Sequence, residues 1–422
     1  MFPLRRALIL SAAALLLPTS QILAVLCAQD TVPAATLLIP HFRVDLDACD
    51  QETGADTVIT IVNTRAESTV AHMTWWTDWG VPTINFSLYL TGYDQQTIDL
   101  KPAFCDGFLP LTGPNVFSNH GSLSGPPPSL PNCELIEEGL SNPLLTGALL
   151  DRVRNGHTGS FDVSFGGCAG TDHGDNIARG YVTFDVINDC SLLFPSDAGY
   201  FLDVAAFDNV LMGEVLYLGP EGFQNEPAVH IEADPTGSEI QPDDRTFYGR
   251  YVAGSGQDLR EPLPSILAAN HSTLAAGSEL LVWRETIATA AATCGTLPAG
   301  LPIAQSDLLV FDEEENPLSV FADAELATNA LALDGIVPPG VVELGWLVLD
   351  ERHAGVESLY GDDRAQAWVT YLSGPDPVAM ASGRETFVLD NTCTGNGFGL
   401  PHRIFADGFE SGDTAMWTNI SP

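Results

Sequence analysis

Positive charge is scarce in this sequence. Its 422 residues include 16 Lys and Arg against 55 Asp and Glu, which gives a formal net charge of -39. Lys101 is the single lysine. Proteins that bind nucleic acids lay lysine and arginine along the phosphates, and no stretch of this chain offers such a basic surface. We therefore expect no nucleic-acid partner.

With so few cations, most of the carboxylates cannot be paired within the chain. One interpretation is an acidic surface that keeps an exported protein soluble. The other is Ca²⁺ binding, because calcium takes hard oxygen ligands. Apart from Ca²⁺, the sequence predicts no cofactor.

Short catalytic motifs are also lacking. We find no G-x-S-x-G, H-E-x-x-H, P-loop or strand-linked G-x-G-x-x-G pattern, and no C-x-x-C pair typical of zinc or redox sites. These absences do not exclude an enzyme, since glycosidases use carboxylates that no short pattern reveals.

The N-terminus has the pattern of a secretory signal peptide, which we place at residues 1–28. Arg5 and Arg6 precede an apolar run that ends at Pro18, and this run is shorter than the roughly 20 residues of a membrane span. Cleavage after Ala28 would take the net charge from -39 to -41, since two arginines leave. Lipidation of Cys27 is the alternative. Either way, the sequence predicts a secreted or cell-surface protein with no transmembrane segment after the signal is removed.

Seven of the eight cysteines follow this signal. In an exported protein they are disulfide candidates rather than metal ligands. Their places in the chain favour pairs of Cys168 with Cys190 and of Cys294 with Cys393. Cys49, Cys105 and Cys133 leave one unpaired, and a Cys105–Cys133 bond would close a long loop.

The body of the chain predicts an all-β protein. Short runs rich in Val, Ile, Thr and aromatic residues are separated by Gly, Pro, Asn and Asp. In residues 84–90, apolar side chains alternate with Asn85, Ser87 and Tyr89, the pattern of a half-buried antiparallel strand. We expect two β-sandwich domains of immunoglobulin-like type, with one short helix and long loops.

The first domain is expected over 33–240 and the second over 245–395, because the stretch between them is polar and contains Pro and Gly. Residues 396–422 are expected to form a flexible tail. Capping residues and apolar spacing predict the single helix within 141–156. In the second domain, residues 246–253 are among the predicted strands.

Two clusters in the first domain are candidate ligand sites. The loop 168–176 holds Asp172, His173, Asp175 and Asn176, which could bind a cation or a substrate hydroxyl or simply form an Asx-rich turn. Trp75, Trp76 and Trp79 could form a stacking platform for sugars, although two adjacent strand residues point to opposite faces, so one of the first two belongs to the core.

Two further acidic clusters are weaker candidates. On the predicted strand 229–234, His230, Glu232 and Asp234 alternate with apolar residues and could present ligands or an acid and a base, or could be a solvated face. Asp312, Glu313, Glu314 and Glu315 fall in a predicted hairpin turn and are candidate metal ligands.

The C-terminal stretch 404–417, IFADGFESGDTAMW, resembles a short tail that recurs on otherwise unrelated secreted bacterial proteins. The residues that carry this likeness are Asp407, Gly408, Phe409, Glu410, Ser411, Gly412, Asp413 and Trp417. Segments 76–100, 175–192 and 309–317 resemble an uncharacterised group of exported bacterial β-rich proteins. The first likeness implies export and sorting or surface attachment, and the second carries no catalytic residue or ligand.

Together these features predict a noncatalytic secreted or cell-surface protein with a structural, adhesive or ligand-binding role, whose partner is an extracellular glycan or protein. A secreted carbohydrate-active enzyme using paired carboxylates is one alternative. A Ca²⁺-stabilised surface protein is the other.

Overall fold

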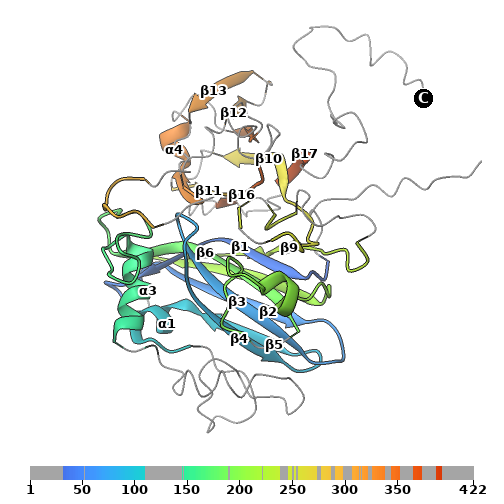
Figure 1. Cartoon of the computed structure of the whole chain (residues 1–422). Coiled ribbons are helices and arrows are strands. Elements are labelled where there is room, and N and C mark those ends of the chain that lie inside the picture. The colour runs from blue at the N-terminus through green and yellow to red at the C-terminus, as the bar shows by residue number, and fades with distance from the viewer. Residues whose placement is uncertain are drawn as a thin grey trace, which may run out of the picture.

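The computed structural model shows a mostly β protein with antiparallel sheets and few helices (Figure 1). It describes residues 32–51, 53–109, 145, 147–188, 191–220, 222–237, 246–249, 251–252, 255–272, 277–286, 290–297, 307–312, 314, 316–321, 326–337, 344–351, 365–372 and 386–391. The predicted signal peptide and C-terminal tail lie outside these ranges. Many of the described strands coincide with predicted β-branched and aromatic runs, but the strands Thr36–Asp45, Gly222–Pro227, Pro264–Ser272 and Thr328–Ala332 were not predicted.

Two sheets form the first half of the chain. One has the order β4-β3-β6-β1-β9 and the other the order β5-β2-β7-β8. The strands are β1 Thr36–Asp45, β2 Asp56–Asn63, β3 Thr69–Thr77, β4 Pro82–Leu90, β5 Gln95–Asp99, β6 Ile177–Ile187, β7 Leu211–Gly219, β8 Gly222–Pro227 and β9 Val229–Ile231.

These two sheets share one apolar core. Alternate residues such as Ile59 and Ile61 of β2 bury their side chains in the same cluster as Phe184 of β6 and Met73 of β3. Strand β4 is more buried than its alternation predicts, because Asn85 and Ser87 on its other face are also buried. The Asn85 amide donates to the carbonyl of Leu192 at 2.9 Å, so the chain after β6 covers this face.

The first half also contains short helices. Asp99 caps helix α1 (Leu100–Asp106), which the sequence analysis missed, by accepting a hydrogen bond from the Lys101 amide. Helix α3 (Ala148–Thr158) confirms a helix in the predicted region, but it ends at Gly159, whose φ of 73° suits glycine, and not at Gly156. The short π-helix η1 spans Tyr200–Val204.

Two disulfides lie within the described residues. Cys49 bonds to Cys105 with a Cα–Cα distance of 5.6 Å, and Cys168 bonds to Cys294 with a distance of 5.2 Å. The antiparallel bridge between Cys168 and Ala291 brings the second pair together from opposite halves of the chain.

The predicted partners of these cysteines were wrong. Cys168 does not pair with Cys190, Cys294 does not pair with Cys393, and Cys105 does not pair with Cys133. The reason is that tertiary contacts, and not nearness in the sequence, fix which cysteines meet. Cys27, Cys133, Cys190 and Cys393 lie outside the described residues.

The second half contains two more sheets, in the upper part of Figure 1. Their orders are β13-β12-β15-β10-β17 and β14-β11-β16. The elements are β10 Pro264–Ser272, β11 Glu279–Arg284, β12 Asp307–Asp312, β13 Pro317–Phe321, β14 Thr328–Ala332, α4 Leu333–Ile336, β15 Leu344–Asp350, β16 Ala367–Leu372 and β17 Thr386–Asn391. Leu280 of β11 and Leu347 of β15 belong to a core that both sheets share.

Residues 246–252 join the two halves, and here the predicted strand was wrong. The described part of this segment forms turns. Its aromatic residues Phe247, Tyr248 and Tyr251 pack in one cluster with Trp76 of β3 and Trp283 of β11. Their spacing therefore reflects packing at the seam between the halves and not a strand.

A buried ionic network reinforces this seam. Arg260 pairs with Asp258 at 3.0 Å and approaches Asp185 of β6 at 3.5 Å, and all three side chains are inaccessible to solvent. Asp185 also accepts hydrogen bonds from the hydroxyl groups of Tyr200 and Tyr248. Because a buried charge must be paired and hydrogen-bonded, this network fixes the connection between the halves in one arrangement.

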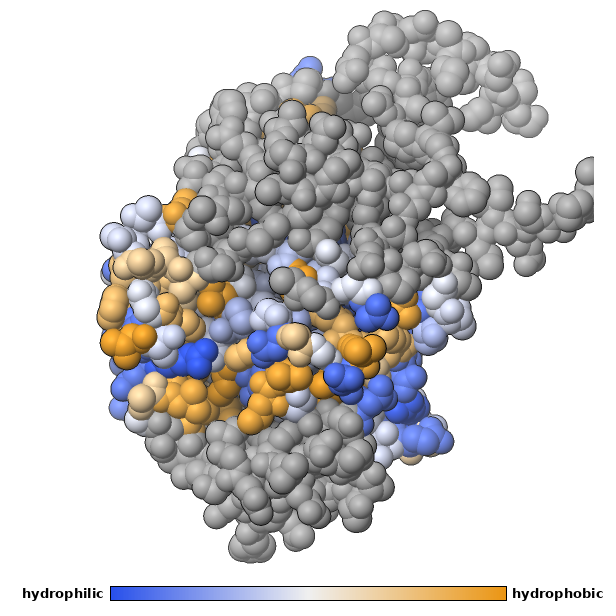
Figure 2. Space-filling view, viewed as in Figure 1, coloured by the Kyte–Doolittle hydropathy of each residue, from blue (hydrophilic) through white to orange (hydrophobic). Residues whose placement is uncertain are grey.

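The described surface has no single apolar face in the view of Figure 2, where hydrophobic and hydrophilic residues are intermixed over the first half. Large exposed apolar residues occur in separate elements, such as Tyr93 before β5, Leu202 in η1 and Phe223 in β8. Scattered apolar residues of this kind are ordinary on soluble surfaces.

Candidate functional site

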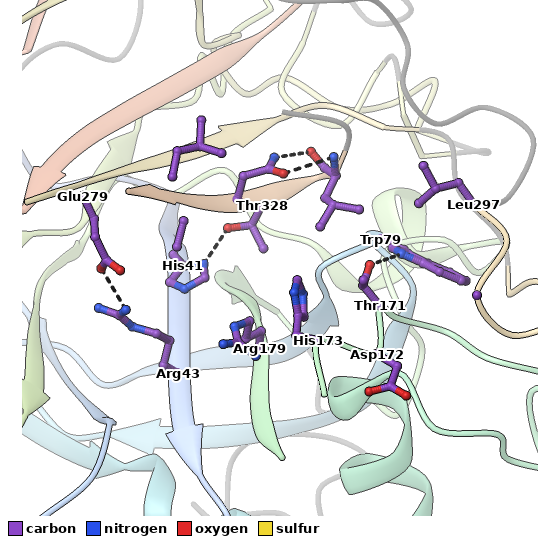
Figure 3. Close-up of a pocket in the computed structure, with 15 residues that line it drawn as sticks. His41, Arg43, Trp79, Thr171, Asp172, His173, Arg179, Glu279, Leu297 and Thr328 are labelled. Carbon is purple, nitrogen blue, oxygen red and sulfur yellow. Dashed lines mark hydrogen bonds and ion pairs between the residues drawn. The ribbon is translucent and has the colours of Figure 1, made fainter. Parts of the chain in front are cut away.

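A cavity of about 530 Å³ lies where the two halves meet (Figure 3). Strand β1 and the loop 171–173 line it from the first half, and β11 and β14 line it from the second. Its polar and aromatic lining residues are His41, Arg43, Trp79, Thr171, Asp172, His173, Arg179, Glu279, Thr328 and Asn329. This volume falls within the usual range for small-molecule sites.

Part of the predicted 168–176 loop forms one wall of this cavity. The buried Asp78 carboxylate holds the loop in place, since it accepts hydrogen bonds from the Thr171 amide at 3.0 Å and from His173 Nε2 at 3.2 Å. Asp172 accepts a hydrogen bond from the Gly174 amide at 2.9 Å. The loop thus combines the Asx turn and the cavity lining that the sequence offered as alternatives.

The other two loop candidates, Asp175 and Asn176, do not line the cavity. Asp175 forms an ion pair with Arg179 at 2.5 Å, and the hydrogen bonds from this guanidinium lower the pKa of the Asp175 carboxyl to about 2. Asn176 has a φ of 51° and donates to Asp47 at 2.6 Å. Asp175 therefore orients a cavity-lining arginine, and Asn176 closes a turn.

Sequence reasoning missed His41, a buried polar residue of the cavity lining. It is 1% exposed, and its Nδ1 lies 2.9 Å from the hydroxyl of Thr328. That hydroxyl donates its proton to the Pro40 carbonyl at 2.7 Å, so it must accept from Nδ1–H. Burial, together with Arg43, Arg179 and His173, lowers the pKa of His41.

His41 is therefore neutral, with its proton on Nδ1 and a lone pair on Nε2. Within the described residues, Nε2 has no hydrogen-bond partner. Nε2 is itself buried, so this lone pair lies within the cavity wall and is not open to the cavity.

Arg43 and Glu279 form an ion pair across the seam. Arg43 Nη1 lies 2.8 Å from Glu279 Oε2, and both side chains are about one-quarter exposed. Figure 3 shows this pair beside His41, with Arg179 and His173 on the other side. No sequence signal pointed to Arg43 or Glu279, because they come together only through the contact of β1 with β11.

The predicted tryptophan platform was wrong. Trp75 is 0% exposed and packs in the first core, and Trp76 is 2% exposed and packs in the seam cluster. Trp79 reaches the cavity wall, but it is 1% exposed and its indole N–H donates to Thr171 at 2.7 Å. None of the three presents an open ring face for stacking.

His230, Glu232 and Asp234 lie outside the cavity lining. His230 is buried, and its Nε2 accepts a hydrogen bond from the Gly213 amide at 3.2 Å. Asp234 caps a local turn through the Thr236 amide at 2.9 Å. The predicted strand is confirmed only over Val229–Ile231, so Glu232 and Asp234 lie beyond its end.

Strands β12 and β13 pair antiparallel, as the predicted hairpin requires. Asp312 accepts hydrogen bonds from the side-chain amide of Asn316 and from the backbone amides of Asn316 and Glu314, and these bonds lower the pKa of its carboxyl. Glu313 and Glu315 lie outside the described residues. Across the described chain, no group of three or more His, Cys, Asp or Glu is arranged to hold a metal ion.

Two carboxyl groups outside the cavity, Asp56 and Asp258, have raised pKa values. Burial raises the pKa of Asp56 to about 6 and also raises that of Asp258. Neither residue lines the cavity. The cavity's own carboxylates are Asp172 and Glu279, each already holding a hydrogen bond or an ion pair.

No family model matches the sequence, and neither the curated proteins nor the solved structures searched contain a match to the chain. In the described part of the chain, no helix combines the length and apolar character needed to cross a membrane.

Proposed function

We propose that this is a noncatalytic secreted or cell-surface protein that binds a small ligand in the cavity between its two halves. The observation that carries this proposal is a cavity of about 530 Å³ that polar side chains from both halves line together. Cavities of this size with a few converging polar groups are typical of small-molecule sites.

Export is supported by the signal-like N-terminus and by the two disulfides of the described chain, since disulfides persist in oxidising compartments. In this proposal each pair of sheets is a sandwich domain of immunoglobulin-like type. The seam between two such domains is a common place for a ligand site.

The test is a thermal-shift screen of the mature chain against neutral sugars, acidic sugars, amino acids and organic acids. At least one class should raise the Tm. The variant Ala330→Phe, which places a ring in the cavity, should abolish that rise while the unliganded protein stays folded. A screen without any rise, or a rise that persists in Ala330→Phe, would refute the proposed site.

The same samples test the carbohydrate-active alternative. A bound saccharide should be recovered unchanged after prolonged incubation, because the two cavity carboxylates, Asp172 and Glu279, are already engaged by the Gly174 amide and by Arg43. Recovery of cleaved products, lost in Glu279→Gln, would establish the enzyme instead.

A further inference from the structure

We propose that acid switches off ligand binding in this cavity, through His173 and the buried carboxylate of Asp78 that holds it. This inference rests on the proposed function, and it names the regulation of that site. It follows from how the two side chains are bonded and from the charges around them.

Asp78 connects the two walls of the cavity. Its carboxylate accepts hydrogen bonds from the Thr171 amide and from His173 Nε2, on the wall of the first half. Its backbone carbonyl accepts the amides of Ala327 at 2.8 Å and Thr328 at 3.3 Å, where β14 of the second half begins. The position of His173 is therefore fixed relative to both walls.

Asp78 also determines which nitrogen of His173 keeps its proton. A carboxylate only accepts hydrogen bonds, so Nε2 carries a proton toward Asp78 Oδ2, 3.2 Å away, in both the neutral and the charged ring. The proton that the ring gains or loses with pH is therefore the one on Nδ1. This atom accepts a hydrogen bond when the ring is neutral and donates one when the ring is charged.

The Nδ1 side of the ring is available to a ligand. His173 lines the cavity and its side chain is one-third exposed. Because Nε2 faces a buried carboxylate, the exposed part lies on the rest of the ring, and Nδ1 has no hydrogen-bond partner among the described residues. In the view of Figure 3, the ring points toward Thr328, whereas the side chain of Asp172 on the same loop points away.

The charges around His173 favour a ligand that donates a hydrogen bond. The charged or titratable side chains near it are Asp78 after β3, His41 and Arg43 of β1, Arg179 of β6, Glu279 of β11, and Asp172 and Asp175 of its own loop. Both arginines are already ion-paired with carboxylates. The lining residues of β14 and of 295–297 are uncharged. An anion would meet this excess of carboxylates, but a hydroxyl, amide or amine group that donates to Nδ1 would not be repelled.

Within this set, His173 is the group expected to change charge between pH 5.5 and 8, because imidazole ordinarily titrates in this range. Burial lowers the pKa of His41 and keeps that ring neutral. Hydrogen bonds from Arg179 lower the pKa of Asp175 to about 2, so that carboxylate stays charged. Acid therefore turns the acceptor on the cavity wall into a donor and adds a positive charge, and a ligand that donates to Nδ1 is released.

The experiment measures affinity by calorimetry at pH 8 and pH 5.5. The probes are maltose, glucuronate, glycine and lactate, one from each class of the thermal-shift screen, together with any other compound of that screen that raises the Tm. None of the four named probes changes charge between these pH values. We expect at least one probe to bind at pH 8 and to bind about tenfold more weakly or worse at pH 5.5, the effect of losing one hydrogen bond.

His173→Gln removes the switch but keeps the anchor. Its amide nitrogen takes the place of Nε2 and donates to Asp78, while no atom replaces Nδ1. Affinity at pH 8 should fall by about tenfold, and it should be the same at pH 5.5.

Nitrogen NMR of the imidazole rings tests the role of Asp78 without a ligand. The ring signal that is missing in His173→Gln identifies His173, and at pH 8 the wild-type ring should carry its proton on Nε2. In Asp78→Asn, the amide oxygen still accepts from Thr171 and the amide nitrogen donates to Nε2, so the proton should move to Nδ1. Affinity at pH 8 should then fall by about tenfold.

The matched control is Asp208→Asn, which makes the same chemical change in the surface ion pair between Arg65 and Asp208. Neither residue lines the cavity. This variant should change neither the proton position on His173 nor the affinity at either pH.

The outcomes distinguish the two proposals. If a probe whose binding is abolished by Ala330→Phe binds equally well at both pH values, or more tightly at pH 5.5, the cavity is the ligand site but the acid switch is wrong. The switch is also wrong if the pH dependence persists in His173→Gln, or if the wild-type ring carries its proton on Nδ1 at pH 8. If no probe binds, both proposals fail.

Discussion

Asp56, at the start of β2, shows how one buried carboxyl affects stability in an acidic protein. It is 7% exposed, and burial together with the neighbouring Asp99 raises its pKa from 3.8 to about 6. A raised pKa means that the folded state binds the proton more tightly than the unfolded state. The free energy of unfolding therefore falls as the pH rises from about 4 to about 6, and it stays lower at neutral pH.

We expect Asp56→Asn to raise the free energy of unfolding at pH 7 by about 1–2 kcal/mol, because the amide carries no charge yet still accepts the Thr57 amide bond. Thermal melts at pH 7 and pH 4 check this. The Tm should rise at pH 7 and stay the same at pH 4, where the wild-type carboxyl is protonated. Asp208→Asn on the exposed surface should change neither Tm, and an equal rise at both pH values for Asp56→Asn would contradict the pKa argument.

At the scale of elements, the Cys168–Cys294 disulfide ties the loop after α3 to the chain that follows β11. It closes 126 residues of sequence and lies next to two cavity-lining stretches, 171–173 and 295–297. The other disulfide of the described chain, Cys49–Cys105, closes 56 residues within the first half. Neither of its cysteines lines the cavity.

Replacing both Cys168 and Cys294 by Ser should destabilise the protein by about 2–5 kcal/mol. It should also weaken ligand binding, since the cavity wall loses its covalent tie. The matched Cys49→Ser/Cys105→Ser variant should lower the Tm but leave affinity unchanged. Melting curves and calorimetry on both variants check this, and equal affinities in the two variants would show that the disulfide does not shape the site.

The strands were the most predictable elements, because alternation and β-branched residues act locally. Residues 246–252 misled that reasoning, since Phe247 and Tyr251 owe their spacing to packing against Trp76 and Trp283. Helix α1 was missed because its seven residues carry little periodic signal.

The candidate site was predictable only in part. Asp172 and His173 were visible as a polar loop, but His41 lies in a strand, Thr36–Asp45, that the sequence did not predict. Its partner Thr328 lies 287 residues further along the chain. No pattern within a short window can reveal a hydrogen bond between such distant residues.

At the scale of the whole molecule, the charge of -39 acts mainly as repulsion spread over the surface. We expect NaCl to raise the Tm by screening this repulsion, and CaCl₂ at the same ionic strength to raise it by the same amount. Thermal melts in both salts test this against the Ca²⁺ alternative. A rise several degrees larger in CaCl₂, reversed by a chelator, would demonstrate specific calcium sites.

The central place of β1 has a consequence for how the chain acquires its structure. Thr36 pairs with Asp185 on one side and with Ile231 on the other. The first strand therefore forms its hydrogen bonds with residues that lie about 150 and 195 positions further along the sequence. Contacts between such distant segments form slowly. Strand β1 can take its place between β6 and β9 only after both have formed, so the first sheet cannot assemble strand by strand in chain order. Until then the apolar strands of the first half are exposed, and this topology makes the unfinished chain prone to aggregation.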